Sequence, residues 1–380
     1  SSAAQPVLEV RSNGTPQRRP FVYIGPGRGP NEGEWWVELE RPQPEEWQFR
    51  VDTGHGRYET PAGQAWFCTG LTRLWLQDGQ IFAYRPAPIL SPARVEKIAA
   101  FEGSLPARPL YVYLPRGYAE QPERTYPVLY MHDGQNCFAA YAKDSFAGSW
   151  RADETASWLI GQGRMAECVI VAVGNGQSER LSEYLPPYVT HRPPAPSIIR
   201  KAKTESLAWS HKPMLGRADQ TAAYYRYEVA DTIARTYRVR RDRAETATCG
   251  SSMGGLFSLY LAWEWTDFAR RHAVMSPSLW VTRSHSGPME TVERLRSDRP
   301  RDLRLWLDSG TQDSPDQGDD GMLDTRAAYE ALLENGYQLG PDFQYYLDEG
   351  AGHNEAAWAG RLPLVLQFLF PPEEEGVISK

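Results

Sequence analysis

The stretch ETATCGSSMGGLFSLYLAWEW (245–265) determines which fold this sequence can adopt. It begins with a short strand-like run (245–250), passes through a turn of small residues, and continues as an apolar segment of helical length (254–265). The turn contains G-x-S-x-G with Ser252 at its centre. A serine on a tight strand-to-helix turn needs small neighbours, because the flanking backbone must approach closely. The stretch therefore predicts a nucleophilic Ser252, with Ser251 packing inward or capping; the alternative is a glycine-rich loop that only turns the chain.

From about residue 100 onwards, strand-like runs alternate with helix-like segments. CVIVAVG (168–174) is continuously apolar, as expected of a strand buried on both faces. The alternation predicts an α/β domain over residues 105–372, with a mostly parallel sheet covered by helices on both faces. Further strands are predicted at 109–115, 126–132, 271–276, 303–310 and 343–350, and helices at 149–164, 217–238, 326–336 and 354–370.

The first ninety residues have a different character, rich in glycine, proline and tryptophan. Short aromatic or β-branched runs are separated by turn residues, which predicts a small all-β, sandwich-like domain over residues 1–90. Residues 91–104 are predicted to be a linker, because prolines cluster just before and within this region, and residues 373–380 a C-terminal tail. The strands are expected within 21–25, 34–40, 46–52 and 72–85, and the exposed side chains of Trp35 or Trp36 would either stack on sugar rings or pack in the core.

One segment interrupts the strand–helix rhythm. Residues 185–216 hold six prolines and show little periodicity. Long irregular segments in compact domains are usually functional covers or disordered chain. We interpret this segment as an insertion near the site that could act as a lid; the alternative is a surface excursion without a role.

Bulk properties exclude several classes of function. The net charge of -7 and the pI near 5.6 give no basis for general nucleic-acid binding. No stretch approaches the roughly 18–20 apolar residues that a membrane span needs. A serine nucleophile needs neither a metal nor an organic cofactor, so none is expected. The four cysteines are far apart and have no metal-ligand spacing. They favour a cytoplasmic location; a removed signal peptide would instead mean a secreted or periplasmic protein.

A serine nucleophile needs a base, since a free hydroxyl reacts poorly at neutral pH. In a strand-alternating fold the partners should follow in the order serine, acid, histidine, each on a loop after a later strand. Three histidines follow Ser252. His272 begins an apolar strand and is expected in the core or at a strand edge, whereas His285 lies in a polar loop. His353 stands directly between the last strand and the last helix, so it is the predicted base; the alternative is a capping or surface histidine.

The acid is expected in the loop DSGTQDSPDQGDD (308–320), which follows the strand 303–308. Asp313 follows the Gly-Thr turn and is placed to reach over the sheet edge towards His353, where it would hold the imidazole tautomer. Asp308, which closes the strand, is the second choice. Asp316 lies farther out, and Asp319, Asp320 and Asp324 are interpreted as solvated loop or helix-start acids.

An oxyanion hole requires two donors. One should be the backbone N–H of Met253, the residue after the nucleophile. The loop after an earlier strand, in YPVLYMHDGQNCF (126–138), supplies the other: Gly134 allows a sharp turn and Gln135 offers its backbone N–H. His132 and Asp133 could instead suggest a metal site, but no second cluster has ligand spacing.

These residues together resemble a known family. YPVLYMHDGQNCF, GSSMGG, MSPSLW and GAGHNEAAWAGRLP are similar to motifs of the putative-esterase family of α/β-hydrolases, which includes feruloyl, acetylxylan and enterochelin esterases and the mycolyltransferases. The resemblance covers roughly residues 105–370 and implies an α/β-hydrolase fold. The N-terminal part only loosely resembles the immunoglobulin-like domains that precede some of these esterases.

The resemblance also implies roles for individual residues. It implies Ser252 as nucleophile, His353 as base, Asp313 as acid, and Gln135 and Met253 as oxyanion donors. Trp150 and Trp280 match positions that line the substrate cleft in relatives, and Asp133 is predicted to bind substrate with them.

The resulting hypothesis is a serine carboxylic-ester hydrolase that acts through an acyl-enzyme on an acylated carbohydrate or similar ester. Three alternatives stay open: an acyltransferase of the mycolyltransferase type, a siderophore esterase, and a carbohydrate-binding protein that retains a hydrolase fold without catalysis. A siderophore substrate is an anionic chelate and would need cations in the cleft. Arg192, Arg200, Lys201 and Lys203 of the insertion are candidates.

Overall fold

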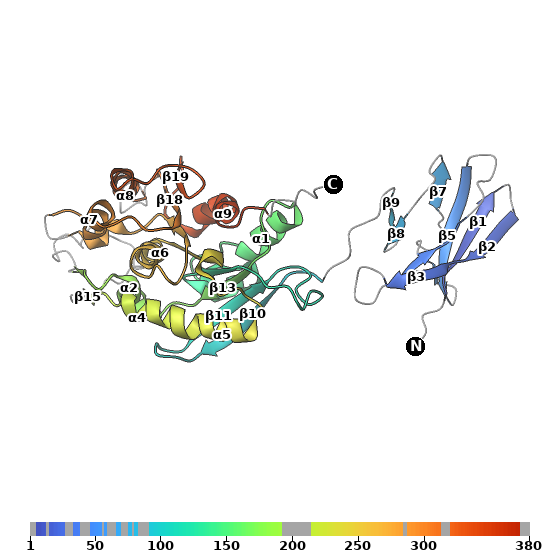
Figure 1. The fold of residues 1–380 in the computed structure, drawn as a ribbon, viewed down its shortest axis with the longest axis horizontal. Coiled ribbons are helices and arrows are strands. Elements are labelled where there is room, and N and C mark those ends of the chain that lie inside the picture. The colour runs from blue at the N-terminus through green and yellow to red at the C-terminus, as the bar shows by residue number, and fades with distance from the viewer. Residues whose placement is uncertain are drawn as a thin grey trace. The chain divides into compact units, whose positions relative to one another are not determined.

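The protein forms two compact units, Ser1–Ser91 and Pro92–Lys380, in a computed structural model (Figure 1). The structure describes residues 5–12, 15–26, 33–38, 46–54, 57–58, 66–69, 75–77 and 80–82 of the first unit, and residues 91–191, 214–283, 287–312 and 320–372 of the second.

The first unit is an antiparallel β region. Strands β1 and β5 pair so that Leu8 lies opposite Val51 and Val10 opposite Phe49, and all four side chains are buried. The predicted small all-β unit is confirmed as antiparallel β structure, whereas an immunoglobulin-like sandwich stays a prediction. Its strands are β1 (Val7–Ser12), β2 (Thr15–Pro20), β3 (Val22–Pro26), β4 (Gly33–Trp36), β5 (Glu46–Gly54), β6 (Arg57–Tyr58), β7 (Trp66–Thr69), β8 (Trp75–Gln77) and β9 (Gln80–Phe82).

The second unit is built on an eight-stranded sheet with the order β10-β11-β13-β12-β16-β17-β18-β19. The β10–β11 and β11–β13 pairs are antiparallel and the remaining pairs are parallel, which confirms the predicted mostly parallel sheet. The strands are β10 (Arg94–Phe101), β11 (Arg108–Leu114), β12 (Val128–Met131), β13 (Val169–Val173), β16 (Thr246–Ser251), β17 (Arg271–Met275), β18 (Arg304–Gly310) and β19 (Phe343–Asp348).

The first strand of this sheet lies where the sequence suggested a linker. Strand β10 occupies most of residues 91–104 and pairs antiparallel with β11 from Arg94 to Phe101. None of its side chains is fully buried. As the edge strand, β10 lacks the continuously apolar run that marks an inner strand, and the prolines before it are typical of a linker.

Helices cover both faces of the sheet. Alternate strand residues point to opposite faces: Val128 and Tyr130 pack in the same core cluster as Leu256 of α6, whereas Leu129 and Met131 pack in the cluster that contains side chains of α1 and α9. No helix among the described residues is long and apolar enough to cross a membrane. The helices are α1 (Ala152–Gly161), α2 (Arg180–Tyr184), α4 (Ala218–Ala223), a π-helical turn (Tyr224–Val229), α5 (Ala230–Thr236), α6 (Met253–Glu264), α7 (Glu290–Ser297), α8 (Met322–Glu334) and α9 (Glu355–Leu369).

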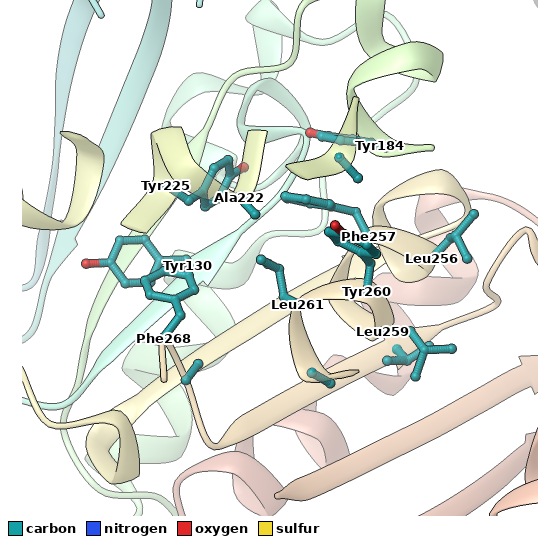
Figure 2. Packing of buried hydrophobic residues seen from close by; sticks show 14 of the residues in the cluster. Tyr130, Tyr184, Ala222, Tyr225, Leu256, Phe257, Leu259, Tyr260, Leu261 and Phe268 are labelled. Atoms are coloured by element: carbon teal, nitrogen blue, oxygen red, sulfur yellow. The ribbon is translucent and has the colours of Figure 1, made fainter. Parts of the chain in front are cut away.

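Helix α6 is the central helix of one face. Its residues 253–263 are all buried, so the helix is enclosed on every side, as expected for a segment that is apolar all round. The ring of Phe257 stacks on Tyr184 with a centroid separation of 5.2 Å and an interplanar angle of 7° (Figure 2). This packing fixes the position of the turn from which α6 begins.

The predicted insertion is described only at its two ends. Strand β14 (Thr190–His191) pairs antiparallel with β15 (Met214–Leu215), which brings the ends together. Residues 192–213, including Arg192, Arg200, Lys201 and Lys203, lie outside the described residues. A role as a lid therefore stays a prediction.

His272 is a core residue, as the sequence predicted. Its ring is completely buried in β17. Nε2–H donates to the carbonyl oxygen of Ala269 at 3.1 Å, and Nδ1 accepts from the Thr248 hydroxyl at 2.8 Å. Both ring nitrogens are thus satisfied in the neutral form. Burial lowers the pKa of His272 to about 3, against the opposing effect of the Ala269 carbonyl.

The neutral state of His272 predicts a loss of stability in acid. The unfolded chain binds a proton near pH 6.5 while the folded protein does not, so stability falls as pH decreases from about 6.5 towards 3. His272→Gln should reduce this slope by about 1.4 kcal/mol per pH unit. Urea unfolding of both proteins at several pH values in this range measures how the free energy of unfolding changes with pH. The same pH dependence in His272→Gln as in wild type would show that His272 is protonated in the folded protein.

Candidate active site

Ser252 sits on a sharp turn between β16 and α6. Its backbone angles are φ 57° and ψ −123°, a conformation that costs energy for a residue with a Cβ atom. Two hydrogen bonds hold the turn: Ser252 N donates to Met275 O at 3.0 Å, and Ser278 N donates to Ser252 O at 3.0 Å. Ser251, by contrast, is buried within β16. The turn therefore presents one serine hydroxyl at the carboxyl end of the sheet.

The glycines around Ser252 are required by close backbone approach. A Cβ atom on Gly250 would lie 2.6 Å from the backbone of Gly254 and 2.6 Å from the His132 ring. A Cβ atom on Gly255 would lie 2.6 Å from the carbonyl oxygen of Met275. Real Cβ atoms do not approach backbone so closely, so the small residues of the opening stretch are a steric necessity.

The Ser252 hydroxyl lies within hydrogen-bond distance of the His353 imidazole. Oγ of Ser252 lies 2.9 Å from Nε2 of His353, which follows β19 and precedes α9. Nδ1 of His353 is hydrogen-bonded to Oδ1 of Asp320. A carboxylate only accepts, so Nδ1 carries the proton and Nε2 accepts from the serine. Trp358 packs edge-on against the imidazole with a centroid separation of 5.0 Å.

The carboxylate at His353 is Asp320. Asp313, which the sequence favoured for this place, lies outside the described residues, and Asp308 contacts Arg361 instead. The interpretation of Asp320 as a solvated acid is wrong, because its side chain is fully buried. Its Oδ2 accepts from Ser276 Oγ at 2.7 Å and from Gly310 N at 2.7 Å, which leaves Oδ1 for His353. These donors lie after β17 and at the end of β18, and their positions depend on tertiary structure.

The two predicted oxyanion donors lie at the carboxyl ends of adjacent strands. Met253 is the first residue of α6, and Gln135 lies in a short 3-10 helix, Gly134–Asn136, that follows β12. Strands β12 and β16 pair in parallel. First-turn N–H groups have no acceptor within their own helix, so both can point to a ligand. Their roles as donors stay predictions.

Asp133 holds the loop that carries Gln135. It accepts from Arg180 Nε at 2.6 Å, Arg180 Nη2 at 2.8 Å and Asn175 Nδ2 at 2.6 Å. Burial opposes its ionisation, but the Arg180 charge and these hydrogen bonds lower the pKa of Asp133 below its usual value. Because these protein groups occupy both carboxylate oxygens, the structure favours a loop-fixing contact over the predicted contact with substrate.

The two predicted substrate tryptophans lie in different environments. Trp150 is buried and packs on Trp358 with a centroid separation of 5.9 Å. Trp358 in turn contacts the imidazole of His353, so Trp150 lies behind this contact. Trp280 is only partly buried and lines a pocket of about 300 Å³ next to His353. The described lining consists of Ser276, Pro277, Ser278, Trp280, Asp320, Gly321, Leu323, Asp324 and His353.

Sequence reasoning overlooked several site residues. Ser278 Oγ lies 3.1 Å from Ser252 Oγ, in the motif MSPSLW that also contains Trp280. Arg361 is buried on the face of α9 that also buries Trp358 and Val365. Its spacing of three and four residues from these side chains, in a segment with a strong apolar stripe, is the signal that could have found it.

His132 does not favour the metal interpretation. Its Nδ1 lies 3.1 Å from the Tyr225 hydroxyl and its Nε2 3.0 Å from the Ser258 hydroxyl. Burial lowers the pKa of His132 to about 3, so the ring is neutral. Over the part of the chain that the structure describes, no group of three or more His, Cys, Asp or Glu residues is arranged to hold a metal ion.

Comparison with known proteins agrees with this architecture. Residues 106–369 match the family described as "Putative esterase". The chain belongs to this esterase family. It is a family of hydrolases with the α/β-hydrolase fold, so the predicted membership is confirmed. No curated protein matches the sequence significantly.

Solved structures of this esterase's fold show low sequence identity. A ferulic acid esterase is 18% identical, with a TM-score of 0.52 over 74% of this chain and 99% of that chain. An IroE-like serine hydrolase from Shewanella oneidensis is 19% identical, with a TM-score of 0.52 over 72% and 79%. The enterobactin esterase FES from Shigella flexneri is 16% identical, with a TM-score of 0.51 over 97% and 89%. At these identities the likeness establishes the fold alone.

The close approach at the Ser252 turn predicts an intolerance of Gly255→Ala. The added methyl would push against the Met275 carbonyl, so we expect the free energy of unfolding to fall by about 1–3 kcal/mol or more. Gly360→Ala in α9 is the matched control: a Cβ there meets nothing within 4 Å, and it should stabilise the helix by up to about 1 kcal/mol. Urea unfolding of both variants checks the pair, and equal effects would contradict the steric account.

Proposed function

We propose that this esterase hydrolyses carboxylic esters through an acyl-enzyme on Ser252. The observation that carries the proposal is the hydrogen-bonded series Ser252–His353–Asp320 at the carboxyl ends of the strands. A serine on a strained turn, an imidazole in contact with it and a buried carboxylate behind the imidazole form the arrangement that activates a hydroxyl. A binding protein would need neither the strain at Ser252 nor the buried charge at Asp320.

The residues act in two half-reactions. Ser252 Oγ attacks the ester carbonyl carbon while its proton moves to Nε2 of His353, and the oxyanion that forms is stabilised by the N–H groups of Gln135 and Met253. Collapse breaks the bond to the alcohol, which leaves with the proton from Nε2. Water then attacks the acyl-enzyme, gives its proton to Nε2, and the acid departs as Ser252 recovers that proton. Asp320 stabilises the imidazolium in both halves.

The pocket supports a neutral ester with an apolar or aromatic part. Trp280, Leu323 and Pro277 supply apolar surface beside His353. Among the described residues that line this pocket, none is lysine or arginine. An acylated carbohydrate or a similar ester suits this lining. Transfer to an alcohol in place of water uses the same residues, and no contact in the described site favours it.

The proposal predicts covalent capture of Ser252. Incubation with a fluorophosphonate should add one label to the wild-type protein, since the activated hydroxyl displaces fluoride from phosphorus. Intact-protein mass spectrometry measures the adduct. Ser252→Ala should remain unlabelled, whereas Ser251→Ala, whose hydroxyl is buried in β16, should keep the label if the variant folds. A label that persists in Ser252→Ala would place the nucleophile elsewhere, and no label on wild type would contradict the activated serine.

The position of the acid gives a second prediction. Asp320→Asn should lower kcat for a p-nitrophenyl ester by roughly 10³–10⁴-fold, because the amide favours the wrong imidazole tautomer. Asp313→Asn is the control that separates the structural assignment from the sequence-based one, and it should keep kcat within about twofold of wild type. A large loss in Asp313→Asn with an active Asp320→Asn would restore Asp313 as the acid.

A further inference from the structure

Arg361 is a buried cation behind the proposed acid. It lies on α9 with a side chain that is 1% exposed. Its Nε donates to Asp308 Oδ1 at 3.0 Å, one terminal nitrogen to Asp348 Oδ2 at 3.3 Å, and Nη2 to Ser276 Oγ at 2.6 Å. The guanidinium therefore joins the ends of β17, β18 and β19, which are the strands around the proposed acid and base.

The Ser276 hydroxyl has only one possible direction. Its oxygen accepts from Arg361 Nη2 and from Trp358 Nε1, the latter at 3.0 Å. Guanidinium and indole nitrogens donate and never accept. The single hydroxyl proton must therefore go to the remaining partner, Oδ2 of Asp320, at 2.7 Å. Two donors on one side of the oxygen thus orient its proton towards the carboxylate.

This oriented hydroxyl fixes the plane of the Asp320 carboxylate. Oδ2 receives Ser276 Oγ–H and Gly310 N–H, both at 2.7 Å, so Oδ1 remains directed to Nδ1 of His353. A hydroxyl free to rotate would present its lone pairs to Oδ2 part of the time and repel it. The hydrogen bond between Asp320 and Nδ1 of His353 therefore depends on the orientation of the Ser276 hydroxyl proton, which the donors Arg361 and Trp358 fix.

Arg361 does not reach the carboxylate directly. Its Nη2 lies 3.8 Å from Asp320 Oδ2, beyond hydrogen-bond distance, but only 2.9 Å from Asp308 Oδ1. Asp308 is fully buried and also accepts from Trp306 Nε1 at 2.7 Å. The pair Arg361–Asp308 therefore places a donor on Ser276, and the same guanidinium also donates to Asp348.

We propose that Arg361 is a positioning residue that acts through the Ser276 hydroxyl on Asp320 and so sets the orientation of His353. The inference rests on the proposed function for its kinetic readout. Replacing a buried ion pair by apolar groups is often neutral or stabilising, so the ion pair by itself is weak evidence for a purely stabilising role. The planar guanidinium of arginine can donate to Asp308 and to Ser276 at the same time, which explains why an arginine occupies this position.

The test is a double-mutant cycle with Ser276→Ala and Arg361→Lys. Lysine keeps the charge but loses the fork that reaches Asp308 and Ser276 at once. Each single change should lower kcat by roughly 10–100-fold with KM within about twofold, the range expected for losing a hydrogen bond to a charged group. The double variant should be no slower than the slower single variant, because both changes remove the same oriented proton. Independent losses that multiply in the double variant would overturn the route through Ser276.

A spectroscopic readout separates this inference from the proposed function. The Nδ1 proton of His353 should give a downfield proton resonance in wild type that moves upfield or disappears in Ser276→Ala and in Arg361→Lys. This measurement needs no turnover, so an inactive wild-type protein would refute the proposed hydrolysis and still test the positioning. A resonance unchanged in both variants would overturn the inference even in an active enzyme.

Two further variants guard against loss of folding. Arg271 lies at the opposite end of β17 and donates to Leu369 O in α9, so Arg271→Lys disturbs the same two elements away from Asp320 and should leave kcat unchanged. Where Arg361→Lys fails to fold, Arg361→Met combined with Asp308→Asn removes both buried charges together. That variant should fold and show the same kcat loss as Ser276→Ala; wild-type kcat in it would contradict the proposal.

Discussion

The site depends on a steric constraint at the turn around Ser252, where the backbone of the flanking glycines packs too closely against neighbouring backbone to leave room for a side chain. Gly250 and Gly255 have no room for a Cβ atom, since Gly254 and the Met275 carbonyl already fill it. Ser252 adopts a positive φ at this turn, and the enclosed helix α6 follows it directly. The strain at Ser252 is thus offset by the burial of a whole helix.

A second constraint operates on the acid side, where loops from three strands must meet. Asp320, Ser276 and His353 come from segments far apart in sequence, and no local pattern fixes their mutual distance. Arg361 contacts the ends of the three strands from a fourth element, α9. Trp358, one turn earlier, supplies both the second donor to Ser276 and the surface on which His353 rests. One face of a single helix therefore orders the residues behind the imidazole.

The limits of sequence reasoning follow from this difference between local and distant constraints. The strand–turn–helix around Ser252 and the place of His353 after the last strand are read from contiguous residues, and the structure brings their side chains into contact. The choice among the five aspartates between 308 and 320 depends on Gly310 and Ser276, which donate across strands, so residue type could not decide it. Strand β10 was missed for a related reason: as the edge strand it has no fully buried side chain, and Glu96 and Lys97 interrupt its apolar residues.

Both flanks of Ser252 place a paired charge one layer behind the groups that would meet the substrate. On one side Arg180 and Asp133 hold the loop of Gln135, and on the other Arg361 and Asp308 hold Ser276. In each case the arginine and its aspartate hold polar groups in a fixed orientation. Preorganised dipoles of this kind favour charge that develops during reaction over charge already present on a ligand. Under the proposed function, such an arrangement would suit an ester that becomes anionic only at its transition state.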